Sequence, residues 1–296
     1  MTGTFRGVFP AMITPMTESE ELDLSKLEAL VEYLIGAGVQ GLIPLGSTGE
    51  FYALTSQERQ KVLETVVRAA AGRVPVVAGV NAAATREVVQ YAREAEALGA
   101  AGVLVAPPYY SLPRPDELLE HYRAVDRAIG VPIMLYNYPG RTGVDMKPEF
   151  LERLAELKNV RYVKESTGET ARISEIILRC GDRLQVFCGC DTVVLESFVL
   201  GATGWVAGIA NVRAAEHVHL YQILANGDYA AARECFFRLQ PLLALIEGSG
   251  KYTQLVKAGC RLEGRDAGPP RRPLLPPIEE EIQPLRAALA MLNKQE

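Results

Sequence analysis

Short apolar runs alternate along the chain with longer amphipathic stretches. Each run holds five to eight consecutive, mostly apolar residues. Continuous runs of this kind are typical of parallel strands, which are buried on both faces. Their centres lie roughly 20 to 35 residues apart, a spacing that accommodates one strand, one helix and two loops. The eight runs are residues 7–14, 41–45, 74–80, 102–106, 131–137, 160–164, 184–189 and 204–209.

The stretches between these runs carry helical periodicity. Residues 23–37, for example, place four leucine and valine side chains on one helical face. Eight strand–helix units with no strand left over predict an α/β fold of the (β/α)8, or TIM barrel, type. A doubly wound open sheet is the alternative, but the turn after the first run lacks the Gly-x-Gly-x-x-Gly pattern of that class. The remaining helical stretches are residues 56–71, 85–98, 115–128, 148–157, 170–180, 191–200 and 212–225.

Beyond residue 225 the pattern is helical only. Residues 229–245, 252–262 and 278–292 have helical periodicity, and the proline-rich residues 268–277 predict a stiff connector before the last helix. We therefore expect residues 1–225 to form a catalytic barrel domain. Residues 226–296 should form a C-terminal helical extension packed on it.

Composition narrows the classes of protein and of partner. The net charge of −5 argues against nucleic acid, and no run of lysine and arginine with interleaved aromatic residues stands out. No run of 18 apolar residues exists, so no membrane span is predicted. The five cysteines are odd in number and show no Cys-x-x-Cys spacing. Together with the absence of a secretory pattern in the first residues, they predict free thiols and a cytoplasmic location.

Lys164 is the reactive residue that the pattern singles out. In this fold catalytic residues lie at the C-terminal ends of strands, and Lys164 ends the run at residues 160–164, whereas the other lysines fall on helical or terminal stretches. Burial favours the neutral amine of a lysine, which attacks carbonyl groups and forms an imine. An ion pair with Glu165 or Glu169 at the barrel rim is an equally good reading of the spacing alone.

Polar residues follow two other runs. Tyr136 ends the run at residues 131–137, where a phenol can relay protons or hold an oxyanion, although a buried aromatic with a satisfied hydroxyl fits as well. Arg141 follows in the next loop, and its guanidinium suits a carboxylate unless it is merely solvated. The Gly46–Glu50 segment, Gly-Ser-Thr-Gly-Glu, could present converging N–H groups and the hydroxyls of Ser47 and Thr48 to a carboxylate; a plain tight loop is the alternative.

A metal site is not expected. His121 lies within a predicted helix, and His217 and His219 lie two residues apart, which points them to different faces of a helix.

Taken together, these motifs resemble the dihydrodipicolinate synthase / N-acetylneuraminate lyase family of Schiff-base, pyruvate-dependent class I aldolases. The resemblance rests on Gly-Ser-Thr-Gly-Glu after the second run, Pro-Pro-Tyr-Tyr after the fourth, Tyr-Asn-Tyr-Pro-Gly-Arg-Thr-Gly after the fifth and Tyr-Val-Lys-Glu-Ser-Thr-Gly at the sixth. It covers nearly the whole chain.

The resemblance implies a role for each of these residues. Lys164 would form the imine with pyruvate or another 2-oxo acid, without any further cofactor, and Tyr136 would move protons at that imine. Ser47 and Thr48 would hold the pyruvate carboxylate. The other implied residues are Tyr110, completing a proton relay across a dimer interface; Arg141, holding the carboxylate of the aldehyde; and Gly189, Ile209 and Asp191, lining the substrate pocket. The resemblance also implies a homotetramer built as a dimer of dimers.

Two substrates stay open within the family. Tyr110 and Arg141 are similar to the synthases that condense pyruvate with aspartate semialdehyde. Ser47, Asp191 and the bulky Trp205 favour instead an aldolase or dehydratase of a 2-oxo-3-deoxy sugar acid, or of an N-acetylneuraminate-like substrate. A third hypothesis is a barrel that only binds a partner and catalyses nothing. The intact set of Lys164, Tyr136, Ser47 and Thr48 argues against it.

Overall fold

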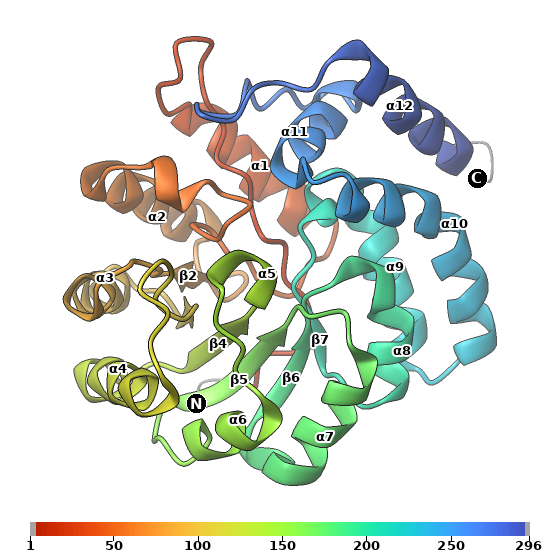
Figure 1. Cartoon of the computed structure of the whole chain (residues 1–296). Coiled ribbons are helices and arrows are strands. Elements are labelled where there is room, and N and C mark those ends of the chain that lie inside the picture. The colour runs from red at the N-terminus through yellow and green to blue at the C-terminus, as the bar shows by residue number, and fades with distance from the viewer. Residues whose placement is uncertain (1–3, 294–296) are drawn as a thin grey trace.

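The computed structural model describes residues 4–293, and Figure 1 shows a ring of helices around a curled parallel sheet. All pairings between the named strands are parallel, and the strand order in the sheet is β1-β7-β6-β5-β4-β3-β2. The strands are β1 (Gly7–Val8), β2 (Val77–Gly79), β3 (Gly102–Val105), β4 (Ile133–Asn137), β5 (Val160–Glu165), β6 (Gln185–Cys188) and β7 (Gly204–Trp205).

The gap between β1 and β2 is filled by residues 41–45, the second predicted strand. Parallel bridges join Ile43 to Ala11 and Leu42 to Val76, so the sheet closes into the predicted barrel. This run forms isolated bridges rather than a continuous strand because prolines interrupt the run itself and the segments on both sides of it. Pro10, Pro44 and Pro75 have no N–H to donate to a ladder.

The helices around the sheet follow the predicted alternation. They are α1 (Leu24–Gly36), α2 (Ser56–Ala70), α3 (Thr85–Ala97), α4 (Pro115–Ala128), a short α5 (Pro139–Thr142), α6 (Pro148–Leu154), α7 (Thr170–Cys180), α8 (Val194–Val199) and α9 (Ala214–Ala225). Within the described residues, no helix is both long and apolar enough to cross a membrane.

Two hydrophobic clusters show which way each strand residue points. The smaller one contains Phe9, Ile43, Leu104, Met134, Tyr162 and Phe187, which are contributed in turn by successive strands around the ring. The larger one holds the residues between the strands and the helices, such as Val103, Leu135 and Val163. Because side chains alternate along a strand, the smaller cluster is the barrel interior. Tyr136 belongs to it, and Lys164 shares the parity of Tyr162.

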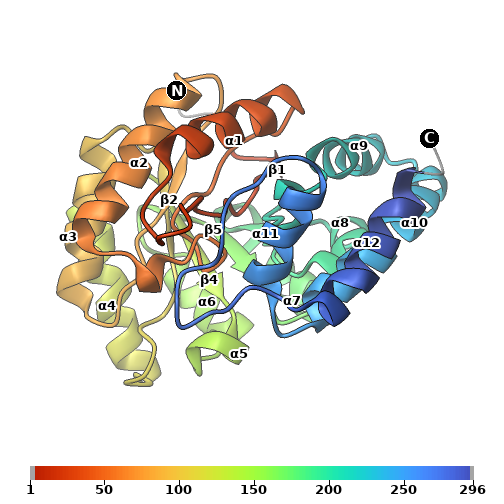
Figure 2. The same cartoon turned by 90° about the horizontal axis from the view of Figure 1, so that it is seen from above.

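The last three helices, α10 (Tyr229–Gly248), α11 (Tyr252–Leu262) and α12 (Glu279–Asn293), lie against one side of the barrel, as Figure 2 shows in blue. The connector between α11 and α12 passes along the red and orange part of the chain, where Arg271 donates to the carbonyl oxygens of Glu20 and Ala53. The division of the chain into two domains at residue 225 stays a prediction.

Candidate active site

The neighbouring strands β4 and β5 bring Tyr136 and Lys164 together. The two residues are register partners near the C-terminal ends of their strands, and both point into the barrel interior. Lys164 is 7% exposed, and its Nζ lies 4.2 Å from the centre of the Tyr136 ring. The strand pattern alone therefore places a buried amine beside a phenol at the end of the barrel where TIM-barrel chemistry occurs.

The ion pair of Lys164 with Glu165 or Glu169 does not form. Glu165 points to the opposite side of β5, where it accepts a hydrogen bond from Asn137 Nδ2 at 3.0 Å and lies 3.6 Å from Arg172 Nε. Among residues 4–293, no carboxylate lies within ion-pair distance of Lys164. The amine is therefore available to a ligand in the barrel mouth.

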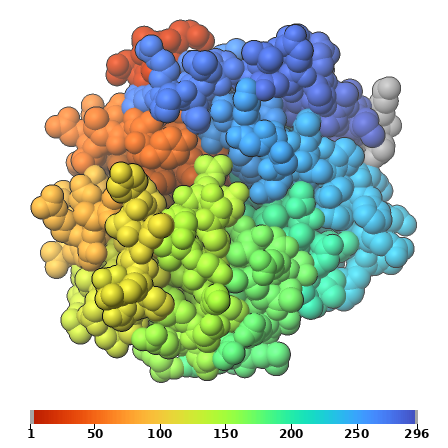
Figure 3. All heavy atoms as spheres, in the orientation of Figure 1, coloured from red at the N-terminus to blue at the C-terminus, as the bar shows by residue number. Residues whose placement is uncertain are grey.

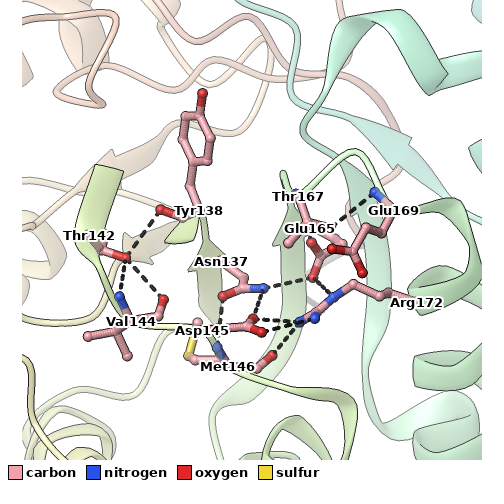
Figure 4. Close-up of polar contacts among 10 residues, drawn as sticks. All are labelled: Asn137, Tyr138, Thr142, Val144, Asp145, Met146, Glu165, Thr167, Glu169 and Arg172. Atoms are coloured by element: carbon pink, nitrogen blue, oxygen red, sulfur yellow. Dashed lines mark hydrogen bonds and ion pairs between the residues drawn. The ribbon is translucent and has the colours of Figure 1, made fainter. Parts of the chain in front are cut away.

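The polar network around Glu165 fixes the ends of both strands from the outside. Asn137 also donates to Asp145, and Arg172 makes two hydrogen bonds to Asp145, of 2.8 and 3.2 Å. Figure 4 shows Asn137 directed into this network and Tyr138 directed away from it. Hydrogen bonds between charged groups are stronger than neutral ones, so this network helps to hold the strand positions that carry Tyr136 and Lys164.

A loop brings the hydroxyl groups. Ser47 Oγ and the Tyr136 hydroxyl share a hydrogen bond of 3.3 Å. In residues 4–293, the backbone N–H groups of Ser47 and Thr48 have no backbone acceptor, so they are free to receive an anion as a nest does. The loop is bracketed by Leu45 and Glu50, which have φ of 62° and 58°. Non-glycine residues in this left-handed region are strained by about 1–3 kcal/mol each, so surrounding contacts must hold the loop.

One set of these contacts comes from the far end of the chain. Glu50 and Lys257 form an ion pair of 2.6 Å and are 0% and 2% exposed. Burial lowers the pKa of Lys257, and the charge of Glu50 opposes that shift. Lys257 also donates to the Pro269 carbonyl oxygen, and the Arg271 N–H donates to Glu50 at 2.7 Å. We call Glu50, Lys257, Pro269 and Arg271 the C-terminal clamp.

A cavity of about 80 Å³ lies between these elements. Of the predicted site residues, Ser47, Thr48, Tyr136, Arg141, Lys164 and Gly189 line it. In Figure 3 the yellow-green, orange and blue parts of the chain meet on this face, so segments far apart in sequence lie side by side. Gly189 is needed for its close approach, because a Cβ there would lie 2.7 Å from Lys164 Cγ.

Three predicted site residues are not brought to the cavity wall. Ile209 starts a short 3₁₀ helix and is buried elsewhere, and the wall is formed instead by Val206, whose parity points it into the barrel. Asp191 is 1% exposed, and its two oxygens accept hydrogen bonds from Trp205 and Tyr252. Tyr110 is 96% exposed in a loop with φ of 74° and points to the outside of this chain.

Residues that the sequence reading missed complete the wall. Glu247, in the last turn of α10, and Tyr252, the first residue of α11, both line the cavity, as does Tyr138. The helical pattern at residues 229–262 predicts buried faces but not which strand ends they meet. The signal that could have found them is Gly-Ser-Gly at residues 248–250, where α10 ends, because this break lets the chain turn in over the barrel mouth.

The pKa values of two carboxyl groups at the cavity are shifted. Glu247 lines the cavity, and Asp191 is buried behind its wall. Burial raises the pKa of Asp191 to about 7, the Glu247 charge adds to that shift, and the hydrogen bonds from Tyr252 and Trp205 oppose it. Burial also raises the pKa of Glu247, opposed by the N–H of Asp191 and by the charges of Lys164 and Arg141. Perturbed acids of this kind gather at functional sites.

The histidines lie away from the cavity. Burial lowers the pKa of both His121, on α4, and His217, on α9, to about 4. Among the described residues, no group of three or more histidine, cysteine, aspartate or glutamate side chains converges as a metal site would require.

Known proteins are similar to this chain over almost its whole length. The sequence profile of the dihydrodipicolinate synthetase family matches residues 4–292. A 4-hydroxy-tetrahydrodipicolinate synthase of Sorangium cellulosum is 40% identical over 97% of this chain and 96% of its own length.

Solved structures resemble the fold equally closely. The dihydrodipicolinate synthase of Aquifex aeolicus superposes with a TM-score of 0.94 at 36% identity, covering 98% of both chains. A chloride-inhibited dihydrodipicolinate synthase of Acinetobacter baumannii, solved in complex with pyruvate, superposes with a TM-score of 0.93 at 32% identity. That match covers 98% of this chain and 99% of the other.

Proposed function

Because the chain belongs to the dihydrodipicolinate synthetase family, we propose that it is a class I aldolase-type lyase that condenses pyruvate with an aldehyde through an imine on Lys164. The product would be that of a 4-hydroxy-tetrahydrodipicolinate synthase. One observation carries this proposal: the Lys164 amine is buried beside Tyr136 at the barrel mouth, with no carboxylate to neutralise it in the described part of the chain.

The first step joins pyruvate to the enzyme. The pyruvate carboxylate binds to the hydroxyls and the N–H groups of Ser47 and Thr48, which places its C2 carbonyl toward Lys164. The amine of Lys164 attacks that carbon, and the carbonyl oxygen leaves as water. The resulting protonated imine is the electron sink of the reaction, so no separate cofactor is required.

The second step forms the carbon–carbon bond. The imine makes the adjacent methyl group acidic, and its proton passes to the relay of Tyr136 and Ser47, whose hydroxyls share a hydrogen bond. The enamine carbon then attacks the aldehyde carbon. The aldehyde oxygen takes a proton from the relay. The amino group of the aldehyde substrate, or water where the aldehyde has none, then attacks the imine carbon and displaces the Lys164 amine, and with the amino group this step closes the ring of the product.

The aldehyde is aspartate semialdehyde in this proposal, and Arg141 at the cavity edge holds its carboxylate. The second candidate is a 2-oxo-3-deoxy sugar acid, cleaved or dehydrated through the same imine. It is favoured by the Ser47 hydroxyl and by a carboxylate in the cavity wall, since acidic side chains bind sugar hydroxyls. Glu247, rather than Asp191, supplies that carboxylate here.

The proposal includes a homotetramer. Tyr110 and Leu112 are 96% and 56% exposed, and both have positive φ. A strained loop that presents large apolar side chains is explained if a second copy covers it. Tyr110 would then reach the proton relay of that copy. Analytical ultracentrifugation of the wild type and of Tyr110→Ala tests this assembly.

We also propose a cytoplasmic location, which rests on the five free thiols of the chain. The other partners in this proposal are small molecules only, a 2-oxo acid and an aldehyde.

Trapping the imine tests the proposed chemistry. Borohydride added with pyruvate should leave a pyruvate-sized adduct on Lys164, detected by intact mass and peptide mapping. Lys164→Ala should give none, whereas Lys147→Ala, which removes an exposed lysine outside the site, should trap like the wild type. A folded wild type that traps neither pyruvate nor a longer 2-oxo acid would overturn the proposal.

A further inference from the structure

Glu247 occupies a place in the cavity that the condensation described above does not use. It reaches the cavity from the last turn of α10, outside the ring of strands, and lines it together with Lys164 and Arg141. Its Oε2 accepts a hydrogen bond from the Asp191 N–H at 3.2 Å. Within residues 4–293, its Oε1 has no hydrogen-bond or ion-pair partner, and it is not among the fully buried atoms. One carboxylate oxygen is therefore held in place and the other is open to a ligand.

The elements behind Glu247 keep it in this position. Asp191 is fixed by Trp205 and Tyr252, so the N–H that it donates to Glu247 is also fixed. Tyr252 in turn packs on Gly208, where a Cβ would lie 2.4 Å from its hydroxyl oxygen. A polar group supported in this way is preorganised to bind.

The charges in the cavity define what such a carboxylate can bind. Among the residues that the structure describes, Lys164 and Arg141 are the cations that line it, and Glu247 is the one acidic side chain in the lining. Pyruvate has no hydrogen-bond donor to offer Glu247, and a second carboxylate would be repelled by it. A carboxylate aimed into a small cavity instead selects a ligand that carries a donor, because a ligand without one leaves its oxygen desolvated and unpaired.

We propose that Glu247 selects the acceptor aldehyde by accepting a hydrogen bond from an ammonium or hydroxyl group on it, while Arg141 binds the carboxylate of the same molecule. This inference rests on the proposed function, since it concerns the second substrate of the reaction at Lys164. The acceptor is thus an aldehyde acid with a donor group. Both an amino acid semialdehyde and a hydroxylated aldehyde acid meet that description.

Matched acceptors test the selection. Aspartate semialdehyde, its analogue without the amino group (succinate semialdehyde) and the analogue with hydroxyl in place of amino are compared as acceptors at saturating pyruvate. The wild type should prefer the donor-bearing aldehydes by about 10- to 100-fold in kcat/KM, the range expected for a hydrogen bond to a charged group. Glu247→Leu should remove this preference, with the loss mainly in KM of the aldehyde.

Glu247→Gln distinguishes the two sources of the donor. Its amide oxygen still accepts from a hydroxyl but carries no charge, so a hydroxylated acceptor should lose only a few-fold and an ammonium-bearing one about 10- to 100-fold. Glu234→Gln makes the same change on the exposed side of α10 and should leave every ratio at the wild-type value.

The borohydride trap with pyruvate separates this inference from the proposed function. If the wild type forms no imine, the proposed function fails. If the wild type forms the imine but shows no preference for a donor-bearing aldehyde, or if Glu247→Leu keeps the wild-type preference while it still traps pyruvate, the role of Glu247 is overturned.

Discussion

The two halves of the active site are held by different means. Tyr136 and Lys164 lie on adjacent strands, and their positions follow from the parallel register and from a polar network packed behind it. Ser47 and Thr48 lie on a loop between two residues of positive φ, and the loop is held by the C-terminal clamp more than 200 residues further along the chain. The barrel itself therefore fixes the position of the nucleophile. The Ser47–Thr48 loop, which we propose binds the pyruvate carboxylate and call the carboxylate seat, depends instead on helices outside the barrel.

The hydrogen bond between Ser47 and Tyr136 joins the two halves, and Tyr136→Phe removes it without changing the ring beside Lys164. Loss of a proton-transfer group slows catalysis by about 10²- to 10⁴-fold. We expect this loss in kcat for condensation, with KM for pyruvate nearly unchanged. Steady-state kinetics check it, and a Phe variant with wild-type kcat would show that the phenol plays no part in proton transfer.

Lys257→Met should separate the halves by breaking the clamp. It leaves Glu50 buried without its cation, which costs about 3–5 kcal/mol of unfolding free energy when one partner of a buried pair is removed. Because the strained loop then loses part of its support, KM for pyruvate should also rise. Urea unfolding and trapping rates measure the two effects.

Lys251→Met is the matched control, because it breaks a half-exposed pair with Glu281, worth about 1 kcal/mol or less. Equal losses of stability and equal rises in KM in Lys257→Met and Lys251→Met would contradict the proposal that the clamp holds the loop. The double variant Glu50→Gln/Lys257→Met, which removes both charges, should recover part of the stability.

The difference between the strand residues and the loop held by the clamp also explains how much the sequence could predict. The sequence places Lys164 and Tyr136, because both stand at the ends of apolar runs, where the barrel rule expects catalytic residues. The clamp and Glu247 lie on helices whose apolar faces predict burial but not a partner. Proline residues at and beside Pro44 make the second strand shorter than expected. Strand β7 ends at Trp205, and the residue that lines the cavity there is Val206 rather than the predicted Ile209.

Asp191→Asn tests the contacts between the barrel and the C-terminal helices, because Asp191 faces Glu247 of α10 and Tyr252 of α11. The raised pKa of Asp191 means that its contribution to stability is present at low pH and is lost as pH rises through about 7. The groups that face it are Glu247, Tyr252, Trp205 and Lys164. The lowered pKa values of His121 and His217 act oppositely, since stability falls as pH drops below 6.5.

Above pH 6.5 the two histidines no longer change the stability, so the pH dependence of stability in this range tests the contribution of Asp191. Between pH 6.5 and about 8 the wild type should lose stability, and Asp191→Asn should lose much less, because the amide carries no charge at any pH. Its oxygen can still accept from the Trp205 N–H, and its NH2 group can donate to the Tyr252 hydroxyl oxygen. Asp182→Asn, on an exposed 3₁₀ helix, is the control. Thermal midpoints across this range measure the slopes, and parallel slopes for wild type and Asp191→Asn would refute the assignment.

The smallest effect concerns a hydrogen bond from the barrel to the backbone of the Ser47–Thr48 loop. Thr14, 2% exposed, donates from Oγ1 to the Gly49 carbonyl oxygen at 2.7 Å. Thr14→Val keeps the shape and removes the donor, which should cost about 1–2 kcal/mol because a buried carbonyl loses its partner. If the clamp carries most of the support, KM for pyruvate should rise only a few-fold, well below the rise in Lys257→Met. A larger rise in Thr14→Val than in Lys257→Met would reverse the comparison and assign the carboxylate seat to the barrel, with the C-terminal helices contributing stability but not the geometry of the loop.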